Sequence, residues 1–526
     1  MTAMLTPMLP PGSYADARAA FRWPVTDAMN MGAQTVDAPA AAAPDGTAVL
    51  EWSPQGVVRH SRAALRDMTD RLAHALSAEP GARIGVLRTQ SAWTAAAHAA
   101  IWKSGAISVP LFKLFGDEAL RLRLTDAGIT TVVTDPEGRA MLAPFGLRVI
   151  VPEEDALPEA GPFPAAATGP DDPAVMIYTS GTTGAPKGAL HGHRMLTGHL
   201  PGVEMSHDRL QPGRDLMWTP ADWAWIGGLF DVAMPALALG IPVVTARLPK
   251  FDADTCRRLI AECGVTATFL PPTALRMLKA ADAAIPGLRS VASGGETLGA
   301  EMLDWGRRAF GLTINEFYGQ TECNMVASSA STLFPARPGS IGKAVPGFDV
   351  QVIDAAGRPT DGEGDIAIRC HMSGGGAASM FLGYWNRPEA TAEKFRGDWL
   401  VTGDRGVIDD GYIRFVGRDD DVITSSGYRI GPSEIEDVLL KHPAVAAAGV
   451  IGKPDPLRTE IVKAYVVLRE GVAASDSLAT ELQDHARTHC AAHSYPREIA
   501  FLHALPMTVT GKVMRRELRR LAEGEP

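Results

Sequence analysis

Cysteine is scarce in this chain, and its scarcity narrows the classes of protein to which the chain can belong. Only five of the 526 residues are cysteines. Their number is odd and no two form a CxxC pair, so neither a disulfide framework nor a cysteine-rich metal site is indicated. We therefore expect a protein of a reducing, cytoplasmic compartment.

An excess of basic residues and long hydrophobic runs are also missing. Lys and Arg total 50 against 60 for Asp and Glu, which gives a net charge of −10. This balance argues against a dedicated nucleic-acid binder, since such proteins usually carry a basic face. The most apolar stretch, residues 226–244, is interrupted by Asp231 and two prolines, so it predicts a buried helix and strand and no membrane span. No signal peptide is expected, because the first thirty residues lack a continuous apolar core.

What is present is the composition of a globular enzyme, with 46% hydrophobic and 21% charged residues. Helical and strand patterns alternate: helices are expected over 61–76 and 92–102, and buried strands over 84–87 and 174–177. This βαβα rhythm predicts an α/β protein with parallel or mixed sheets covered by helices.

The later part of the chain changes character. After about residue 357, short strands separated by Gly and Asp turns predict a small β-barrel-like part. The last hundred residues mix strands and helices, which predicts a small C-terminal α+β domain. Residues 38–46 and 152–173 have the composition of linkers and are expected to be surface loops.

The glycine-rich segment YTSGTTGAPKG, residues 178–188, follows an apolar strand directly. Glycines let backbone N–H groups approach a ligand closely, and successive N–H groups in a turn form an anion-binding concavity. Ser and Thr hydroxyls add donors, and Lys187 adds a positive point charge. The spacing differs from GxxxxGK[ST], so the segment predicts a polyphosphate-binding loop other than the ordinary P-loop.

Two other segments carry groups that suit a bound nucleotide. Thr321 can donate a hydrogen bond to a phosphate oxygen, and Glu322 offers the oxygen ligand that Mg²⁺ prefers. Asp404 could accept hydrogen bonds from ribose hydroxyls, although an Asp in a turn equally often caps its own backbone. Lys512 by itself is one more basic residue beside a cluster of arginines.

Taken together, these segments resemble the AMP-forming acyl-CoA synthetase family, also called the adenylate-forming superfamily. The segments that carry the resemblance are YTSGTTGAPKG at 178–188, SGGET at 293–297, YGQTE at 318–322, TGD at 402–404, GRDDDVI at 417–423, SGYRI at 426–430 and PMTVTGK at 506–512. The resemblance covers about residues 50–520. It is strongest to short- and medium-chain acyl-CoA synthetases, through ADWAWIGG at 221–228 and the run at 108–116.

The resemblance implies roles for individual residues. Lys512, Thr321 and Glu322 would be catalytic, with Glu322 also the Mg²⁺ ligand. Asp420 would be the hinge between an N-terminal ATP- and acyl-binding domain, residues 1–419, and a mobile C-terminal domain, residues 420–526. The ATP-binding residues would be Thr179, Ser180, Gly181, Thr182, Thr183, Lys187, Gly295, Glu296, Thr297, Glu316, Phe317, Tyr318, Gly319, Gln320, Thr321, Asp404, Arg418 and Arg429.

The acyl and CoA sites are implied by fewer residues. Ser426, Gly427 and Arg487 would contact CoA. Trp223 and Trp225 would line the acyl or CoA channel, although core packing is as good an interpretation of them. In acetyl-CoA synthetases a Trp at the place of Gly319 closes the acyl pocket, so an acid longer than acetate is favoured here. One departure from the family pattern is Thr424, where many members carry Lys.

The predicted activity is activation of an aliphatic carboxylic acid by ATP to acyl-AMP and pyrophosphate, followed by transfer to coenzyme A. The alternatives are loading of a phosphopantetheine carrier protein, an aryl-CoA ligase and, less favoured, a catalytically dead nucleotide sensor. Acylation of Lys512 would remove its charge, so we also hypothesise that the enzyme is regulated by reversible acylation there.

Overall fold

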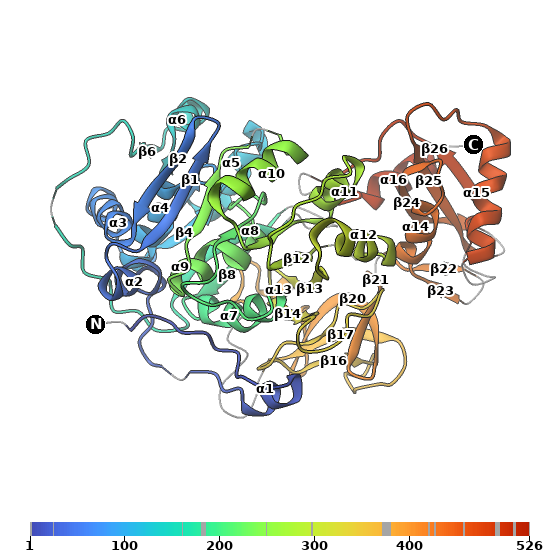
Figure 1. The fold of residues 1–526 in the computed structure, drawn as a ribbon, viewed down its shortest axis with the longest axis horizontal. Helices are drawn as coiled ribbons and strands as arrows, with labels where there is room; N and C mark the ends of the chain where they lie inside the picture. The colour runs from blue at the N-terminus through green and yellow to red at the C-terminus, as the bar shows by residue number, and fades with distance from the viewer. Residues whose placement is uncertain are drawn as a thin grey trace.

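Four sheets and the helices that cover them make up the molecule (Figure 1). The structure is a computed structural model that describes residues 3–24, 26–159, 161–179, 186–248, 250–295, 298–370, 380–418, 421–425, 428–455, 458–489, 495–508 and 512–524. No helix in these ranges is both long enough and apolar enough to cross a bilayer.

The first sheet has seven strands in the order β18-β8-β7-β4-β3-β5-β6. The strands from β7 to β6 in this order are parallel, and β8 and β18 are antiparallel to their neighbours. Helices α3 and α4 cover one face and α5 covers the other, so apolar residues alternate between two cores along each strand. The elements are β3 Arg83–Leu87, β4 Ile107–Pro110, β5 Thr131–Thr134, β6 Arg148–Ile150, β7 Pro173–Thr179, β8 Lys187–Gly192, β18 Gly383–Tyr384, α3 Arg62–Leu76, α4 Ala92–Lys103, α5 Asp117–Ala127 and α6 Pro136–Leu142.

The second sheet has nine strands in the order β15-β14-β13-β12-β11-β9-β10-β1-β2. Helices α10, α11 and α12 pack on one face, while α7, the π-helix η3 and α9 pack on the other. The elements are β1 Thr47–Ser53, β2 Gly56–Ser61, β9 Met217–Trp218, β10 Val243–Ala246, β11 Ala267–Phe269, β12 Ser290–Gly294, β13 Asn315–Gln320, β14 Asn324–Ser328, β15 Lys343–Ala344, α7 Met195–Ser206, α8 Ile226–Gly228, η3 Leu229–Ala233, α9 Met234–Ala238, α10 Ala253–Cys263, α11 Pro272–Ala280 and α12 Ala300–Phe310.

A third, antiparallel sheet forms the half-barrel expected after residue 357, with strands β16-β17-β20-β19 and β21 paired to β20. A fourth sheet builds the small C-terminal domain together with α14, α15 and α16 (Figure 1). The predicted α/β class with a small C-terminal α+β domain is therefore confirmed. The elements are β16 Val350–Ile353, β17 Gly364–Arg369, β19 Phe395–Arg396, β20 Trp399–Asp409, β21 Tyr412–Arg418, β22 Ile423–Ser425, β23 Tyr428–Ile430, β24 Val445–Asp455, β25 Thr459–Leu468, β26 Glu498–Phe501, α13 Pro388–Ala392, α14 Pro432–Leu440, α15 Asp476–His489 and α16 Arg515–Glu523.

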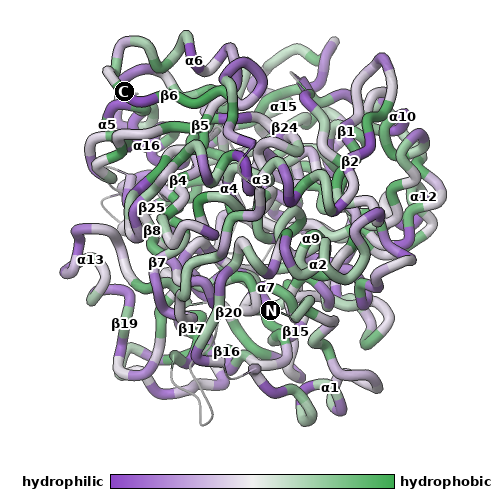
Figure 2. Tube along the Cα trace, turned by 90° about the vertical axis from the view of Figure 1, so that its left-hand side faces the viewer, coloured by the Kyte–Doolittle hydropathy of each residue, from purple (hydrophilic) through white to green (hydrophobic). Residues whose placement is uncertain are grey.

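Local sequence accounts for where the helices begin and end. Helix α3 begins after Ser61, whose hydroxyl accepts a hydrogen bond from the backbone N–H of Ala64 at 3.1 Å. Helices α5 and α10 end at Gly128 and Gly264, both in the left-handed conformation that glycine adopts without strain. Hydrophobic residues are frequent on the interior strand β4, and hydrophilic residues are frequent on the outlying α13 (Figure 2).

The prediction of a surface loop over residues 38–46 is wrong. Residues Ala38–Ala42 form helix α2, which continues the π-helix η1, Ala33–Asp37, and buries Ala38, Pro39 and Ala40. Alanine has the highest helix propensity, and a proline is tolerated in the first turn. The second predicted loop, 152–173, contains no helix or strand among its described residues before β7 begins at Pro173.

Candidate active site

The glycine-rich loop connects two antiparallel strands in the first sheet. Thr179 ends β7 and Lys187 begins β8, and the two residues are partners in the strand register. The Nζ atom of Lys187 lies 5.1 Å from the centroid of the Tyr384 ring. Ser180, Gly181, Thr182 and Thr183 lie outside the described residues. The loop therefore starts beside the edge strand β18, which carries Tyr384.

Glu322 contacts the same tyrosine. It lies in the turn between β13 and β14, next to Thr321, and is 8% exposed. The hydroxyl of Tyr384 donates a hydrogen bond to Oε1 of Glu322. Burial and the Glu322 charge both raise the pKa of Tyr384, so its hydroxyl stays protonated and acts as a donor. Tyr384 was missed from the sequence; its only local signal was an aromatic pair, Tyr384-Trp385, after a glycine.

A second cluster surrounds Asp404 on β20. Oδ2 of Asp404 accepts hydrogen bonds from the hydroxyl of Tyr318 at 2.5 Å and from Nε2 of Gln320 at 2.7 Å. Burial raises the pKa of Asp404, while the Tyr318 hydrogen bond and the charge of Arg418 act in the opposite direction. Arg418 faces Asp404 across the β20–β21 register. Hydrogen bonds between residues 82 to 86 positions apart in the sequence thus bring the YGQTE and TGD motifs together.

The segment expected against the adenine begins at the end of β12. Gly294 pairs in register with Phe317, and a Cβ at Gly294 would lie 2.6 Å from the Phe317 ring. The neighbouring Gly295 has a φ of +96°, a conformation that side chains rarely adopt. Glu316 is buried, its pKa is raised well above the usual range by burial, and it accepts from the Leu298 N–H at 3.3 Å. Glu296 and Thr297 lie outside the described residues.

The C-terminal domain brings Lys512 to this segment. A Cβ built at Gly295 would lie 3.8 Å from Cε of Lys512. The Lys512 side chain is exposed, and its backbone N–H donates to Oγ1 of Thr508 at 3.0 Å. Nearby, a Cβ at Gly299 would lie 3.4 Å from the carboxyl group of Asp437 on α14. Two segments of the C-terminal domain therefore face the β12–α12 connection of the N-terminal part.

The hinge and CoA predictions fall largely outside the described residues. Asp420, Ser426 and Gly427 are not described, nor is the side chain of Arg429 on β23. Arg487 is exposed on α15, forms an ion pair with Asp484 at 3.1 Å and lies over the Tyr495 ring. These contacts lie within the C-terminal domain.

Beside the predicted hinge, Asp421 is tied to helix α16. Arg519 donates to its carboxyl group at 2.8 Å, and Arg515 lies 3.4 Å away. Arg515 also forms two hydrogen bonds of 2.7 Å with Glu436 on α14. Residue 421 is therefore fastened to the C-terminal domain.

The predicted acyl-pocket residues differ in their surroundings. Trp223 is 1% exposed and belongs to the main hydrophobic core. Trp225 is half-buried, with ring centroids 5.6 Å from Phe112 and 5.9 Å from Phe115. Gly319 lies at a register shift between β13 and β14, where a Cβ would come within 1.6 Å of the carbonyl oxygen of Asn324. The backbone itself therefore requires glycine at 319.

A magnesium ion fits the donor set around Glu322. Within the described ranges no group of three or more His, Cys, Asp or Glu side chains could hold a metal alone. Mg²⁺ commonly takes one or two carboxylates and completes its shell with phosphate oxygens and water. The Glu322 carboxylate, which contacts the same tyrosine as Lys187, suits such a shared ion.

Comparison with known proteins gives a consistent result. The profile described as AMP-binding enzyme matches residues 36–385, and that of the AMP-binding enzyme C-terminal domain matches residues 434–512. The human acyl-coenzyme A synthetase ACSM2B, mitochondrial, is 41% identical over 360 residues, which cover 67% of this chain and 62% of the relative. The acetyl-coenzyme A synthetase of Bacillus subtilis strain 168 is 36% identical over 445 residues, 79% of this chain and 76% of the relative.

Similar solved structures include the Brucella canis acyl-CoA synthetase. It is 33% identical with a TM-score of 0.73, and the match covers 98% of this chain and 99% of that one. In contrast, the chain spans less than two thirds of the length of the human relative.

Proposed function

The chain belongs to the family of AMP-binding enzymes, and from that premise we propose that it is an AMP-forming acyl-CoA synthetase. It activates an aliphatic carboxylic acid longer than acetate with ATP, releases pyrophosphate and transfers the acyl group to coenzyme A. The observation that carries this proposal is the approach of Lys512 to Gly295, at the end of the strand that lies beside the phosphate and ribose clusters.

In the first half-reaction, a carboxylate oxygen of the acid attacks the α-phosphorus of ATP and the bond to the β-phosphate breaks. Two anions meet in this step, so positive charge is needed where negative charge accumulates. Lys512 supplies that charge at the carboxylate and α-phosphate, and the Thr321 hydroxyl donates to an α-phosphate oxygen. Lys187 and the glycine-rich loop hold the other phosphates.

The nucleotide is held by the second cluster. Asp404 accepts hydrogen bonds from the ribose hydroxyls, while Tyr318 and Gln320 fix the orientation of its carboxyl group. Arg418 contacts the ribose, and the segment from Gly295 to Thr297 lies against the adenine. When bound at Glu322, Mg²⁺ neutralises phosphate charge. Tyr384 orients the Glu322 carboxylate for that task.

In the second half-reaction, the thiolate of coenzyme A attacks the acyl carbon and AMP leaves with the electrons of the C–O bond. Lys512 occupies the site in the first half-reaction and has to leave it for the second. We infer that the C-terminal domain, residues 420–526, rotates about Asp420 between the steps. The attachment of Asp421 to α16 supports this division, since residues after 420 would move with the C-terminal domain.

The size of the acid is proposed from Gly319. No side chain projects from this position into the acyl pocket, in contrast to the Trp that closes it in acetyl-CoA synthetases. Propionate through medium-chain or branched acids are therefore favoured over acetate. An aryl acid is the alternative, and the aromatic group of Phe112, Phe115 and Trp225 is the feature that would favour it.

A pyrophosphate-release assay over a panel of carboxylic acids, with and without coenzyme A, tests the proposal. We expect slow, acid-dependent release without coenzyme A and rapid turnover to a thioester with it. Acetate as the best substrate would contradict the size argument. Release that responds to a phosphopantetheine carrier protein and not to free coenzyme A would favour the carrier-loading alternative.

Two further proposals concern the setting of the enzyme. A cytoplasmic location is proposed from the scarcity of cysteine, although the human relative is named as mitochondrial. Regulation by reversible acylation of Lys512 is supported by the exposure of its side chain. Full adenylation activity in protein acylated at Lys512 would contradict it.

A further inference from the structure

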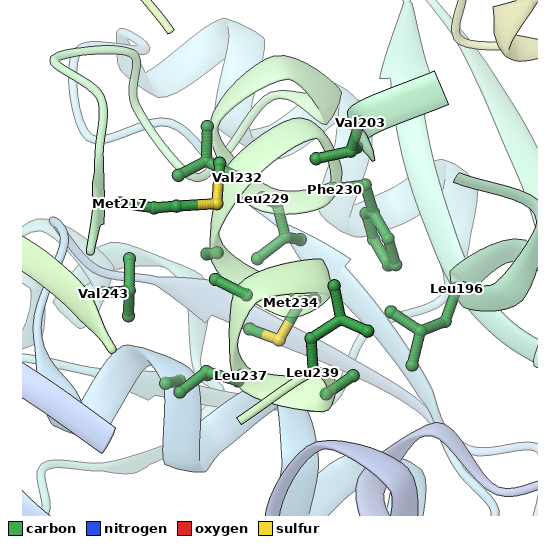
Figure 3. Packing of buried hydrophobic residues seen from close by; sticks show 14 of the residues in the cluster. Leu196, Val203, Met217, Leu229, Phe230, Val232, Met234, Leu237, Leu239 and Val243 are labelled. Atoms are coloured by element: carbon green, nitrogen blue, oxygen red, sulfur yellow. The ribbon is translucent and has the colours of Figure 1, made fainter. Parts of the chain in front are cut away.

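A carboxyl group lies buried in the apolar helix that packs between the two large sheets. Asp231 is in the π-helix η3, with Phe230 and Val232 as its neighbours. Phe230 points toward Leu196 and Val203 of α7, while Val232 lies beside Met217 of β9 (Figure 3). Asp231 is 7% exposed. Such a residue usually has a hydrogen-bonding partner, because an unsatisfied buried polar group costs about 1–3 kcal/mol.

Among the described residues, a buried histidine lies within 4 Å of the Asp231 carboxyl group. Nε2 of His199 lies 3.6 Å from Oδ1 of Asp231, which is beyond a hydrogen bond. Nδ1 of His199 is 3.0 Å from the carbonyl oxygen of Met195, so Nδ1 carries the proton and Nε2 keeps a lone pair. Within the described part of the chain, His199 Nε2 is buried and makes no hydrogen bond.

Burial favours the uncharged form of both groups. It raises the pKa of Asp231 well above its usual range and lowers the pKa of His199 to about 4. In these forms the pair offers a carboxyl O–H donor and an imidazole acceptor whose atoms lie 3.6 Å apart. A hydroxyl group lying beside the pair, at about 2.8 Å from each atom, could accept from one and donate to the other.

A series of contacts between neighbouring residues connects this pair with the catalytic lysine. A Cβ at Gly227 would lie 3.7 Å from Oδ2 of Asp231 and 3.0 Å from the edge of the Phe269 ring. Phe269 and Phe317 form a tilted ring pair with centroids 5.1 Å apart.

The path continues from the ring pair to Lys512. The Phe317 ring packs against Gly294, and the next residue, Gly295, is the one that Lys512 approaches. The acid's carboxylate would lie at the Lys512 end, the two rings would flank its chain, and Asp231 would lie at the far end.

We propose that Asp231 and His199 form a specificity site that binds a hydroxyl group on the distal part of the acid, so that the preferred substrates are hydroxylated aliphatic acids. This inference rests on the proposed function, because it places the acid's carboxylate at Lys512. It goes beyond that function by naming the substrate class. A site built to hydrogen-bond a hydroxyl strongly rejects an analogue without it, whereas an apolar pocket scarcely distinguishes the two.

The test compares acids of equal size that differ in polarity. The pairs are 4-hydroxybutanoate with pentanoate, 5-hydroxypentanoate with hexanoate, and 6-hydroxyhexanoate with heptanoate. We expect at least one hydroxy acid to exceed its partner in kcat/KM by about tenfold or more. Asp231→Leu should reverse that preference and Asp231→Asn should retain part of it, because an amide still donates and accepts. Asp222→Asn is the matched control, since the Asp222 carboxyl group is half-buried and accepts from the Ala224 N–H at 2.7 Å.

Binding of non-hydrolysable acyl-sulfamoyl adenosines, made from the same acids, separates failure of this inference from failure of the proposed function. Tighter binding of the hydroxyacyl analogue to the wild-type protein supports the inference even if Asp231→Leu does not fold. Equal or weaker binding of every hydroxyacyl analogue overturns it while leaving the proposed function intact. Preference for an ω-amino acid would also overturn the inference, because the site would then bind a cationic group in place of a hydroxyl. Binding of none of the analogues would overturn both.

Discussion

Two buried carboxyl groups, Asp404 at the proposed nucleotide site and Asp231 at the proposed acyl site, have opposite surroundings. Asp404 accepts two hydrogen bonds from Tyr318 and Gln320 and faces Arg418 across the strand register. The Asp231 carboxyl group lies 3.6 Å from a histidine nitrogen, which is beyond a hydrogen bond. The Asp404 carboxyl group is thus held by side chains of the protein itself. The acyl side keeps a polar group whose partner, on our proposal, arrives with the substrate.

The largest effect is expected at Lys512, where the two sides meet. Lys512→Ala should slow pyrophosphate release by on the order of 10²–10³, the usual cost of losing one placed stabilising group. Thioester formation from preformed acyl-AMP and coenzyme A should change little, which single-turnover measurements would show. Lys441→Ala, at an exposed lysine of the same domain, is the control. Equal loss in both half-reactions would contradict the assignment of Lys512 to the first half-reaction.

The next largest effect is expected on the nucleotide side. Asp404→Asn removes the charged acceptor, and hydrogen bonds to charged groups are worth about 1.5–3 kcal/mol. We therefore expect the KM for ATP to rise by about 10- to 100-fold, measured at saturating acid. Asp409→Asn, at the exposed end of the same strand, should leave it unchanged. A rise in the KM for the acid, with no rise in the KM for ATP, would contradict the assignment of Asp404 to nucleotide binding.

A smaller change is expected on the acyl side. Gly227→Val places methyl groups near the edge of Phe269 and the carboxyl group of Asp231. It should lower kcat/KM for acids of six or more carbons about tenfold relative to propionate, since one methylene in a pocket is worth about 1–3 kcal/mol. The KM for ATP serves as the internal control. An unchanged chain-length profile would show that the acyl chain does not pass Gly227.

The smallest effect is expected for Tyr318→Phe. It removes one of the two donors to Asp404 and leaves Gln320 in place, so a loss of about 0.7 kcal/mol, or about threefold in the KM for ATP, is expected. Tyr412→Phe removes a comparable hydroxyl, bonded to the Pro335 carbonyl away from the site, and should have no effect. An effect as large as that of Asp404→Asn would mean that Tyr318 contacts the nucleotide itself.

Much of the fold was predictable because its signals are local. The Ser61 cap and the apolar spacing after it indicated α3, and the apolar run before the glycine-rich loop indicated β7. The helix over Ala38–Ala42 was mistaken for a loop, because a run of alanines with two prolines has the composition of a linker as well as that of a helix. Composition alone could not show that this segment is buried.

The candidate site was predictable only where a motif marks it. Glu322 and Asp404 lie in recognisable segments, whereas Tyr384 is 62 residues from the carboxylate that it contacts and has no motif of its own here. Asp231 was visible only as an interruption of an apolar stretch. Its relation to His199 depends on how η3 packs against α7, which periodicity does not reveal.

The contact between position 319 and the backbone of Asn324 also constrains how this enzyme could evolve. A tryptophan cannot be introduced at 319 by a single replacement, because even its Cβ would overlap the Asn324 carbonyl oxygen. The strand irregularity between β13 and β14 would first have to be removed by changes elsewhere, and those changes bring no benefit until the tryptophan is present. On the proposal that the preferred acids are longer than acetate, the path of the main chain at position 319 would preserve that preference, because tryptophan requires changes elsewhere as well.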